Sequence, residues 1–193
     1  MNLALIILLI ALGFVFVLTA VLARYGLFVS VKISEQEVGP YVLVCENHVG
    51  PYQNTGPIMD KIYYDLKDNF RLETTKGFGI YYDNPREVAK DELRSIAGCI
   101  VETKSLDETK QIIDKYKIME FPASKSVVTE FPFKGKLSVF VGIFKVYPKL
   151  AAFAAERSYA QKPIMEMYDM PNAKIVYISS VHLDDEVFDS FLK

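Results

Sequence analysis

Residues 3–23 form an apolar run that carries no charge, with Thr19 as its one polar residue. A helix rises about 1.5 Å per residue, so a run of this length crosses a hydrocarbon core of about 30 Å. Three interpretations are open: a membrane anchor, a cleaved signal peptide ending near Ala23, and a buried core helix. A core helix this long would carry polar residues, and a signal peptide would begin with positive charge and have a shorter apolar stretch. We therefore favour an uncleaved anchor over residues 1–24, held in the lipid bilayer through residues 3–23.

The charges that flank this run predict its direction. Only Met1 and Asn2 precede it, whereas Arg24 and Lys32 follow it. Positive residues concentrate on the cytoplasmic side of membrane proteins. We therefore expect a single-pass protein with its N-terminus outside the cell or in a lumen and its C-terminal domain in the cytoplasm. A prokaryotic inner membrane and the endoplasmic reticulum both agree with this orientation.

Composition limits what the rest of the chain binds. The formal net charge is −2 and the Lys and Arg residues are scattered, so we expect no nucleic-acid partner. His48 and His182 are too few for a metal site built from histidines, and we expect neither a metal nor a cofactor. Cys45 and Cys99 lie in apolar runs, which favours buried free thiols over a disulfide and suits a reducing cytoplasm.

Hydrophobic periodicity predicts the elements of the domain. Alternating side chains and short apolar runs predict strands, whereas spacings of three and four predict helices. The expected strands cover residues 28–33, 41–48, 77–83, 92–101, 118–121, 126–131, 164–168 and 173–180. The expected helices cover residues 57–68, 106–116 and 136–158, the last of them interrupted or kinked at Pro148.

The order strand–helix–strand–strand occurs twice along the chain. We therefore predict an α+β fold in which a duplicated strand–helix–strand–strand unit forms one antiparallel sheet, with two helices on one face, after an N-terminal transmembrane helix. The opposite, concave face would remain to bind a ligand. The predicted organisation is an anchor (1–24), a juxtamembrane segment with a short strand (25–37), one domain (38–183) and a short acidic tail (184–193).

Four segments, together with this element order, resemble the GyrI-like family of small-molecule-binding domains. They are HVGPY at 48–52 with Thr55-Gly56, IYYDNP at 80–85, FPA, VVT and FPF within 121–133, and PIMEMY at 163–168. Within this family the chain most resembles single-pass endoplasmic-reticulum proteins that act as ER-phagy receptors. The resemblance implies a binding or adaptor protein with a small ligand, a protein partner, or both.

The resemblance to the ER-phagy receptors covers the anchor and the domain only. Those receptors carry a long acidic tail, whose motif binds autophagy ubiquitin-like proteins through an aromatic residue followed three positions later by Leu, Ile or Val. The segment at 41–44 fits by letters but is predicted to be an internal strand, and the segment at 188–191 ends in Phe. The autophagy role therefore does not carry over to residues of this sequence.

Glu166 is the first candidate for a ligand-binding residue. It lies in a predicted apolar strand, where alternation places Glu166 and Tyr168 on one face. An acid buried there is costly unless it is paired. The alternatives are a solvent-facing side chain or an ion pair with a neighbour such as Arg157. The resemblance implies that a Glu here supplies negative charge to an aromatic pocket for a cationic or amphipathic molecule, with cation–π contact to Tyr168.

The other candidates come from the strands and loops that carry the resemblance. Tyr81 and Tyr82 alternate, so only one of them can face the pocket, and core packing is the competing interpretation for both. Glu46 and His48 share a strand face, but without a nucleophile a surface or rim pair is the simpler explanation. The candidate ligand-binding set is thus Glu166, Tyr168, Tyr81, Tyr82, His48 and Tyr52.

Catalysis is the alternative function. Glu166 could act as a general base with a tyrosine hydroxyl as proton donor in a small-molecule hydrolase. The sequence holds no G-x-S-x-G, no H-E-x-x-H and no phosphate-binding loop. We therefore assign no catalytic residue and expect a binding protein rather than an enzyme.

Overall fold

A computed structural model describes residues 2–102 and 115–193. The helix expected over 106–116 falls almost wholly outside the described residues. Along the chain the elements are α1 (Leu3–Arg24), β1 (Ile33–Val38), β2 (Tyr41–Val49), the short 3-10 helix η1 (Tyr52–Asn54), α2 (Thr55–Phe70), β3 (Lys76–Tyr81), β4 (Arg94–Val101), β5 (Lys117–Phe121), β6 (Ser124–Pro132), α3 (Lys136–Glu156), β7 (Ile164–Asp169), β8 (Lys174–Ser180) and α4 (Asp185–Leu192).

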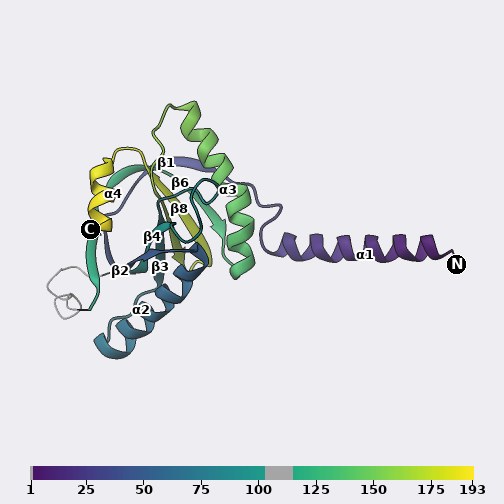
Figure 1. The fold of residues 1–193 in the computed structure, drawn as a ribbon, viewed down its shortest axis with the longest axis horizontal. Helices are drawn as coiled ribbons and strands as arrows, with labels where there is room; N and C mark the ends of the chain where they lie inside the picture. Colours follow the sequence, from purple (N-terminus) through teal and green to yellow (C-terminus); the bar gives the residue numbers. More distant parts are fainter. Residues whose placement is uncertain (1, 103–114) are drawn as a thin grey trace.

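The eight strands form one antiparallel sheet in the order β1-β6-β8-β7-β3-β4-β2-β5, which confirms the α+β class (Figure 1). The sheet curls, so Val128 on β6 and Phe121 on β5 share one core cluster although five strands lie between β6 and β5 in the order. Each of α2 and α3 is preceded by two strands and followed by two. The seam between β3 and β7 lies at the middle of the sheet.

Both α2 and α3 pack on the same face of the sheet. Ile62 and Leu66 of α2, one helical turn apart, are buried against Val44 and Cys99. Pro57 occupies the first turn of α2, where its missing N–H costs nothing. Residues packed with α3 come from β6 and β8, and the strand register places them on the face that also carries Val44 and Cys99.

The face opposite α2 and α3 differs from our expectation. It does not form an open concave surface, because a large apolar cluster fills the inside of the curled sheet. Residues 184–193, expected to form a tail, contain α4, whose Phe188 and Phe191 are buried in that cluster. The predicted buried free thiols, Cys45 and Cys99, are confirmed.

Helix α3 is continuous through Pro148, so of the interruption or kink expected there the interruption is wrong. Pro148 is exposed, while Val146 and Leu150 on either side of it are buried against the sheet. The proline ring therefore meets solvent rather than neighbouring side chains, and packing of both halves holds the helix together.

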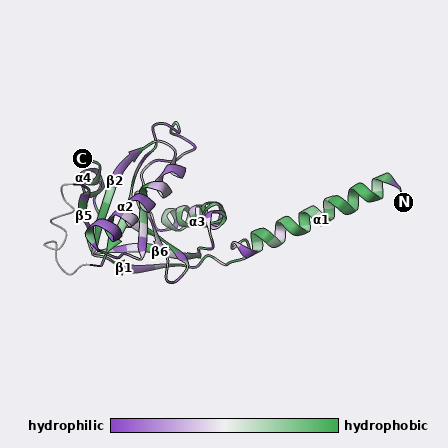
Figure 2. Ribbon diagram, turned by 90° about the horizontal axis from the view of Figure 1, so that it is seen from below, coloured by the Kyte–Doolittle hydropathy of each residue, from purple (hydrophilic) through white to green (hydrophobic). Residues whose placement is uncertain are grey.

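Helix α1 extends away from the domain, and none of its residues is buried (Figures 1 and 2). A buried core helix is therefore excluded, and the anchor and the signal peptide remain. Residues 28–32 link α1 to the sheet and are not a strand; the first strand begins instead at Ile33, where pairing with Thr129 of β6 starts. Thr129 also donates a 2.7 Å hydrogen bond to the carbonyl of Lys32.

Candidate ligand-binding site

Glu166 lies at the middle of the sheet, on the face that carries α2 and α3. It pairs with Gly79 of β3 on one side and with Tyr177 of β8 on the other. Its side chain is 2% exposed. Alternation along β7 turns Met165 and Met167 into the opposite core and leaves Glu166 under the two helices. The alternative of a solvent-facing glutamate is therefore wrong.

Two tyrosine hydroxyls hold the carboxylate. Tyr147, from α3, donates to Oε1 at 2.7 Å, and Tyr168, two residues along β7, donates to Oε2 at 2.7 Å. Within the described part of the chain no Lys or Arg pairs with Glu166, and Arg157 instead contacts Glu35 at 3.1 Å. Burial raises the pKa of Glu166 above its usual value, while the hydrogen bonds from Tyr168 and Tyr147 oppose that rise.

Tyr81 lies above the backbone of Gly79, beside the carboxylate. A Cβ at position 79 would come within 2.7 Å of the Tyr81 hydroxyl, so a glycine makes room for this ring. Thr55 at the start of α2 lies 3.2 Å from the same hydroxyl, and the ring of Tyr52 meets the ring of Tyr81 edge to face at 4.8 Å. Burial, followed by the nearby charge of Glu166, raises the pKa of Tyr81.

Tyr177 completes the tyrosines around Glu166. Its ring meets that of Tyr147 edge to face at 5.9 Å, and the charge of Glu166 adds to burial in raising the pKa of its hydroxyl. Among the described residues its buried hydroxyl has no hydrogen-bond partner. We name Glu166, Tyr147, Tyr168, Tyr81 and Tyr177 the tyrosine cage.

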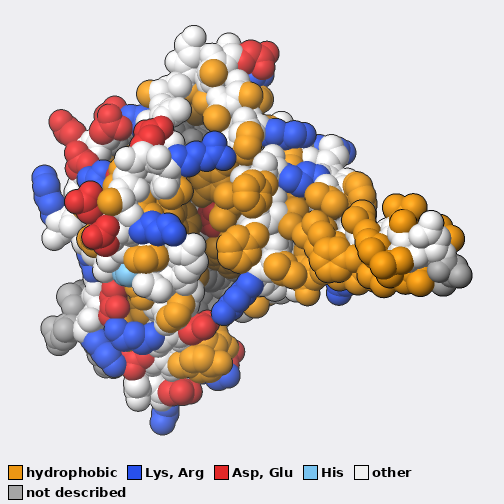
Figure 3. Space-filling model, turned by 45° about the vertical axis from the view of Figure 1, so that its right-hand side comes forward, with side chains coloured by type: hydrophobic (Ala, Val, Ile, Leu, Met, Phe, Trp, Pro, Cys, Tyr) orange, Lys and Arg blue, Asp and Glu red, His pale blue; other side chains and the backbone are white. Residues whose placement is uncertain are grey.

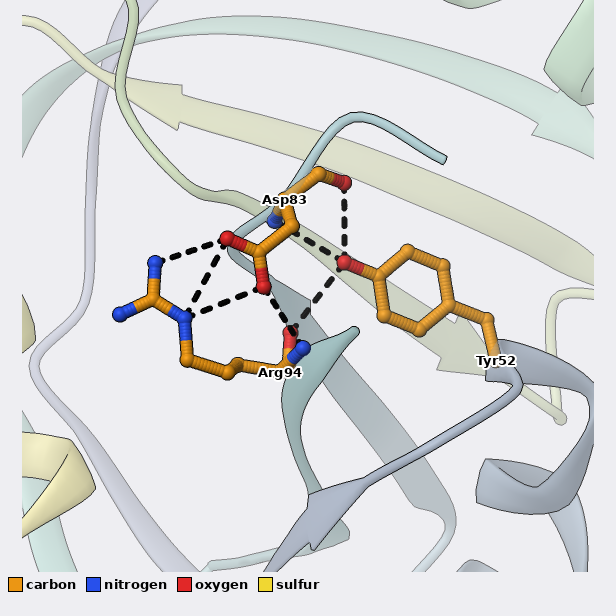
Figure 4. A network of polar contacts seen from close by, with 3 residues as sticks. All are labelled: Tyr52, Asp83 and Arg94. Carbon is orange, nitrogen blue, oxygen red and sulfur yellow. Dashed lines mark hydrogen bonds and ion pairs between the residues drawn. The ribbon is translucent and has the colours of Figure 1, made fainter. Parts of the chain in front are cut away.

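The hydroxyl of Tyr52 is fixed by a polar network with Asp83 and Arg94 (Figure 4). Its hydroxyl donates to the carbonyl of Asp83 at 2.9 Å and accepts from the N–H of the same residue at 2.9 Å. Asp83 in turn pairs with Arg94 at 2.7 Å. Hydrogen bonds from Arg94 are the main cause that lowers the pKa of Asp83. The ring of Tyr52 is thereby positioned against Tyr81, while its hydroxyl is already engaged.

The surface of the domain is hollowed on the side seen in Figure 3. Hydrophobic side chains rim the hollow, and acidic atoms show at its floor. A concave, largely apolar site with a few convergent polar groups is typical of small-molecule binding. In the described residues no three His, Cys, Asp or Glu side chains gather to hold a metal ion.

A family model described as a GyrI-like small molecule binding domain matches residues 32–177, which is most of the chain. The chain belongs to the GyrI-like family. Among curated proteins it is similar to human Testis-expressed protein 264, with 29% identity over 151 residues that cover 74% of this chain and 46% of the relative. The mouse homologue is 28% identical over 127 residues, 63% of this chain and 39% of that protein. The chain thus spans less than half the length of these curated relatives.

Solved structures share the GyrI-like fold at low identity. The C-terminal domain of EcmrR has a TM-score of 0.55 and 14% identity, with 80% of this chain and 99% of that chain covered. EcmrR in a complex with DNA has a TM-score of 0.56 and 13% identity, over 78% of this chain and 57% of that chain. SAV2435 bound to tetraphenylphosphonium has a TM-score of 0.52 and 14% identity, over 78% of this chain and 93% of that chain.

Two candidate residues of this GyrI-like domain lie away from the cage. Tyr82 points to the opposite face, where its hydroxyl donates to the carbonyl of Phe188 at 2.9 Å. The ring of His48 lies 3.3 Å from the carbonyl of Pro51, and Glu46 pairs with Lys61 at 2.6 Å instead of with His48. The structure therefore brings together Glu166, Tyr168 and Tyr81, with Tyr52 behind Tyr81.

The sequence interpretation missed Tyr147, Tyr177 and Thr55. A signal for Tyr177 was present: the turn at 170–173 joins Asp169 to Lys174, and counting back along this hairpin places Tyr177 opposite Glu166. No comparable signal existed for Tyr147. It reaches Glu166 only because α3 packs on this face of the sheet, and the residues around it in the sequence have the pattern of an ordinary apolar helix.

Proposed function

We propose that this GyrI-like protein is a membrane-anchored receptor for a lipophilic cation. The observation that carries the proposal is a buried carboxylate whose hydrogen-bond donors, among the described residues, are tyrosine hydroxyls rather than a Lys or Arg side chain. A buried unpaired charge is destabilising. A bound cation would supply the missing positive charge, so the buried carboxylate would serve ligand binding rather than stability.

The aromatic part of the cage suits the rest of such a ligand. Tyrosine ring faces attract a cation by about 0.5–2 kcal/mol, and an apolar surround removes competing water. The unpartnered hydroxyl of Tyr177 offers one further polar contact. Tetraphenylphosphonium, which is bound in SAV2435, is a cation of this chemistry and serves as the probe.

Calorimetric titration of the full chain in detergent with tetraphenylphosphonium tests this proposal. Glu166→Gln keeps the shape of the side chain and removes its charge, so affinity should fall about tenfold or more, equivalent to about 1.4 kcal/mol. Glu120→Gln, on an exposed side chain of β5, is the matched control and should bind like the original. Triphenylphosphine oxide, which is neutral, should bind weakly to all three. Equal affinity of Glu166→Gln and the original for the cation would refute the proposal.

The anchor is the second part of the proposal. Helix α1 is long and apolar enough to cross a membrane, as is α3 by the same criteria of length and composition. The flanking Arg24 and Lys32 support a domain on the cytoplasmic side. Protease added to intact cells or to intact microsomes should digest the domain only if the domain lies on the outer side of that membrane. Protection in intact cells and digestion in intact microsomes support a cytoplasmic domain, and the reverse pattern contradicts it.

An internal duplication would explain why the cage lies at the centre of the sheet. If β1, β2, β3 and β4 are replaced by β5, β6, β7 and β8 and the reverse, the strand order reads the same from the opposite edge of the sheet. This symmetry supports two related halves. The cage then lies at the seam between the halves, with Thr55 of α2 and Tyr147 of α3 as its contacts from the two helices.

An adaptor role is the competing proposal, supported by the similarity to Testis-expressed protein 264. It predicts a protein partner whose affinity does not change in Glu166→Gln. The hydrolase alternative is less favoured by the geometry. Each carboxylate oxygen accepts a tyrosine hydrogen bond, and these bonds stabilise the charged form of Glu166 and so make it a weaker base toward water.

A further inference from the structure

The outer face of α3 is apolar where a soluble domain would present polar side chains. Leu137, Phe140 and Phe144 are 42%, 49% and 72% exposed, and their spacing of three and four places them on one face of the helix. Ile143, 41% exposed, lies beside them, and the exposed Pro148 continues the same face. We call Leu137, Phe140, Ile143 and Phe144 the apolar stripe.

The apolar stripe lies where the anchor leaves the domain. The Lys145 ammonium donates to the carbonyls of Gly26 and Leu27, directly after α1, and thereby ties α3 to the end of the anchor. Leu22 and Tyr25 also pack against the cluster that α3 forms with the sheet. Figure 1 shows α3 running across the direction of α1, on the side of the domain from which α1 projects.

The surrounding surface continues the apolar character. Phe28, four residues after the end of α1, is 73% exposed. In Figure 3 hydrophobic side chains extend from α1 onto the adjoining part of the domain. Exposed apolar surface of this kind marks an interaction site. With α1 in a bilayer, this surface lies at the level of the lipid headgroups.

Lysines flank the apolar stripe. Lys134 and Lys136 precede it, Lys149 follows it, and all three are exposed. A helix with aromatic and aliphatic side chains on one face and lysines beside them is typical of binding in the membrane interface. Each Lys near an anionic leaflet contributes about 1 kcal/mol of attraction. The charge pattern therefore selects a bilayer over a second protein as the occupant.

A second membrane crossing by α3 does not fit its packing. The inner side of the helix is buried against the sheet through Ser138, Val141, Val146 and Leu150. Tyr147 of the same helix holds Glu166. Insertion across the bilayer would remove these contacts, whereas lying flat on the surface keeps them.

We infer that the apolar stripe of α3 docks into the headgroup region of the anchor's own bilayer, so that the domain lies against the membrane rather than hanging free. This inference rests on the proposed anchoring by α1. The docked helix would embed Phe140 and Phe144 by about 5–10 Å, as other interfacial helices do.

Depth-dependent fluorescence quenching tests this docking. The chain holds no Trp, so Phe144→Trp introduces a single reporter at a position that is 72% exposed and tolerates the larger ring. Tyr64→Trp, at a 59% exposed position on α2, is the matched control. Both full-length variants are placed in nanodiscs of phosphatidylcholine and phosphatidylserine that carry a quencher either high or low on the acyl chain.

The shallow quencher should reduce the emission of Phe144→Trp on the order of twofold and leave Tyr64→Trp nearly unchanged. Stronger quenching by the deep label would indicate a second crossing, and equal weak quenching at both positions would indicate a free domain; either result overturns the docking. Flotation of the unmodified chain with vesicles reports the anchor separately. A chain that floats but shows no quenching at position 144 refutes the docking alone, whereas a chain that does not float refutes the anchoring.

Discussion

The hydroxyl of Tyr147 on α3 lies 2.7 Å from the carboxylate of Glu166 on β7 and joins helix to sheet across the centre of the domain. The same bond connects α3, for which we infer membrane docking, to the proposed ligand site. A cation bound by Glu166 would compete with or reinforce this bond. The position of α3 and the occupancy of the cage are therefore expected to depend on each other.

Glu166→Gln should stabilise the domain at neutral pH. The folded-state pKa of Glu166 is raised, so the original protein loses stability as pH rises from the unfolded pKa through the folded one. The variant carries no such charge and should gain on the order of 1 kcal/mol at about pH 7.5, a shift of about 2–4 °C in Tm. Thermal melts at about pH 7.5 and about pH 4.5 should show this gain only at the higher pH. A constant difference across pH would contradict a buried, ionised Glu166.

Gly79→Ala should disturb the cage without touching its acid. The new Cβ would lie 2.7 Å from the Tyr81 hydroxyl and push the ring from its place beside Glu166. We expect a loss of about 1–3 kcal/mol in stability, together with weaker binding of tetraphenylphosphonium. Gly56→Ala is the control, because nothing lies within 4 Å of its Cβ and α2 gains a better helix former. Denaturant melts should give a lower free energy of unfolding than the original for Gly79→Ala and a higher one for Gly56→Ala.

Asp83→Asn should weaken the network behind Tyr52 in a pH-dependent way. Arg94 lowers the pKa of Asp83 in the folded state, so this contribution is present above the unfolded pKa and is lost as pH falls through the folded pKa. The variant should therefore be less stable than the original at neutral pH and nearly equal to it in acid. Asp91→Asn, at an exposed position, should show no such trend. A deficit for Asp83→Asn that persists in acid would argue against the ion pair as its cause.

Phe188→Ala should show that α4 is part of the folded domain. The side chain is 2% exposed and packs in the main core cluster, so its removal should cost about 3–5 kcal/mol. Asp189→Ala, on the neighbouring exposed residue, should be close to neutral. Urea unfolding measures both. Equal stability of the two variants would mean that residues 184–193 behave as a dispensable tail.

Local sequence pattern predicts the strands and singles out Glu166 as a candidate site residue, because both depend on residues close by in the sequence. Alternation correctly places Glu166 and Tyr168 together and separates Tyr81 from Tyr82. Alternation does not say which face the helices cover. The candidate site was therefore expected on the open side of the sheet, whereas Glu166 lies under α2 and α3.

The helix contribution to the cage depends on packing between distant segments. Tyr147 and Phe144 are three positions apart in one apolar run, yet the first is turned to Glu166 and the second to solvent. The tail was misjudged for a related reason. The acidic residues of 184–193 are exposed, and the two buried phenylalanines stand three positions apart, a spacing too short to establish a helix alone.

The short link between α1 and α3 would determine how closely an anchored domain is held to its membrane. Because Lys145 ties α3 to the residues directly after α1, an anchored α1 would confine the apolar stripe to a small volume beside the bilayer. Its contact with lipid would then be an intramolecular event with a high effective concentration, so four side chains of modest individual affinity would suffice. A longer, flexible tether in the same place would dilute that contact and release the domain.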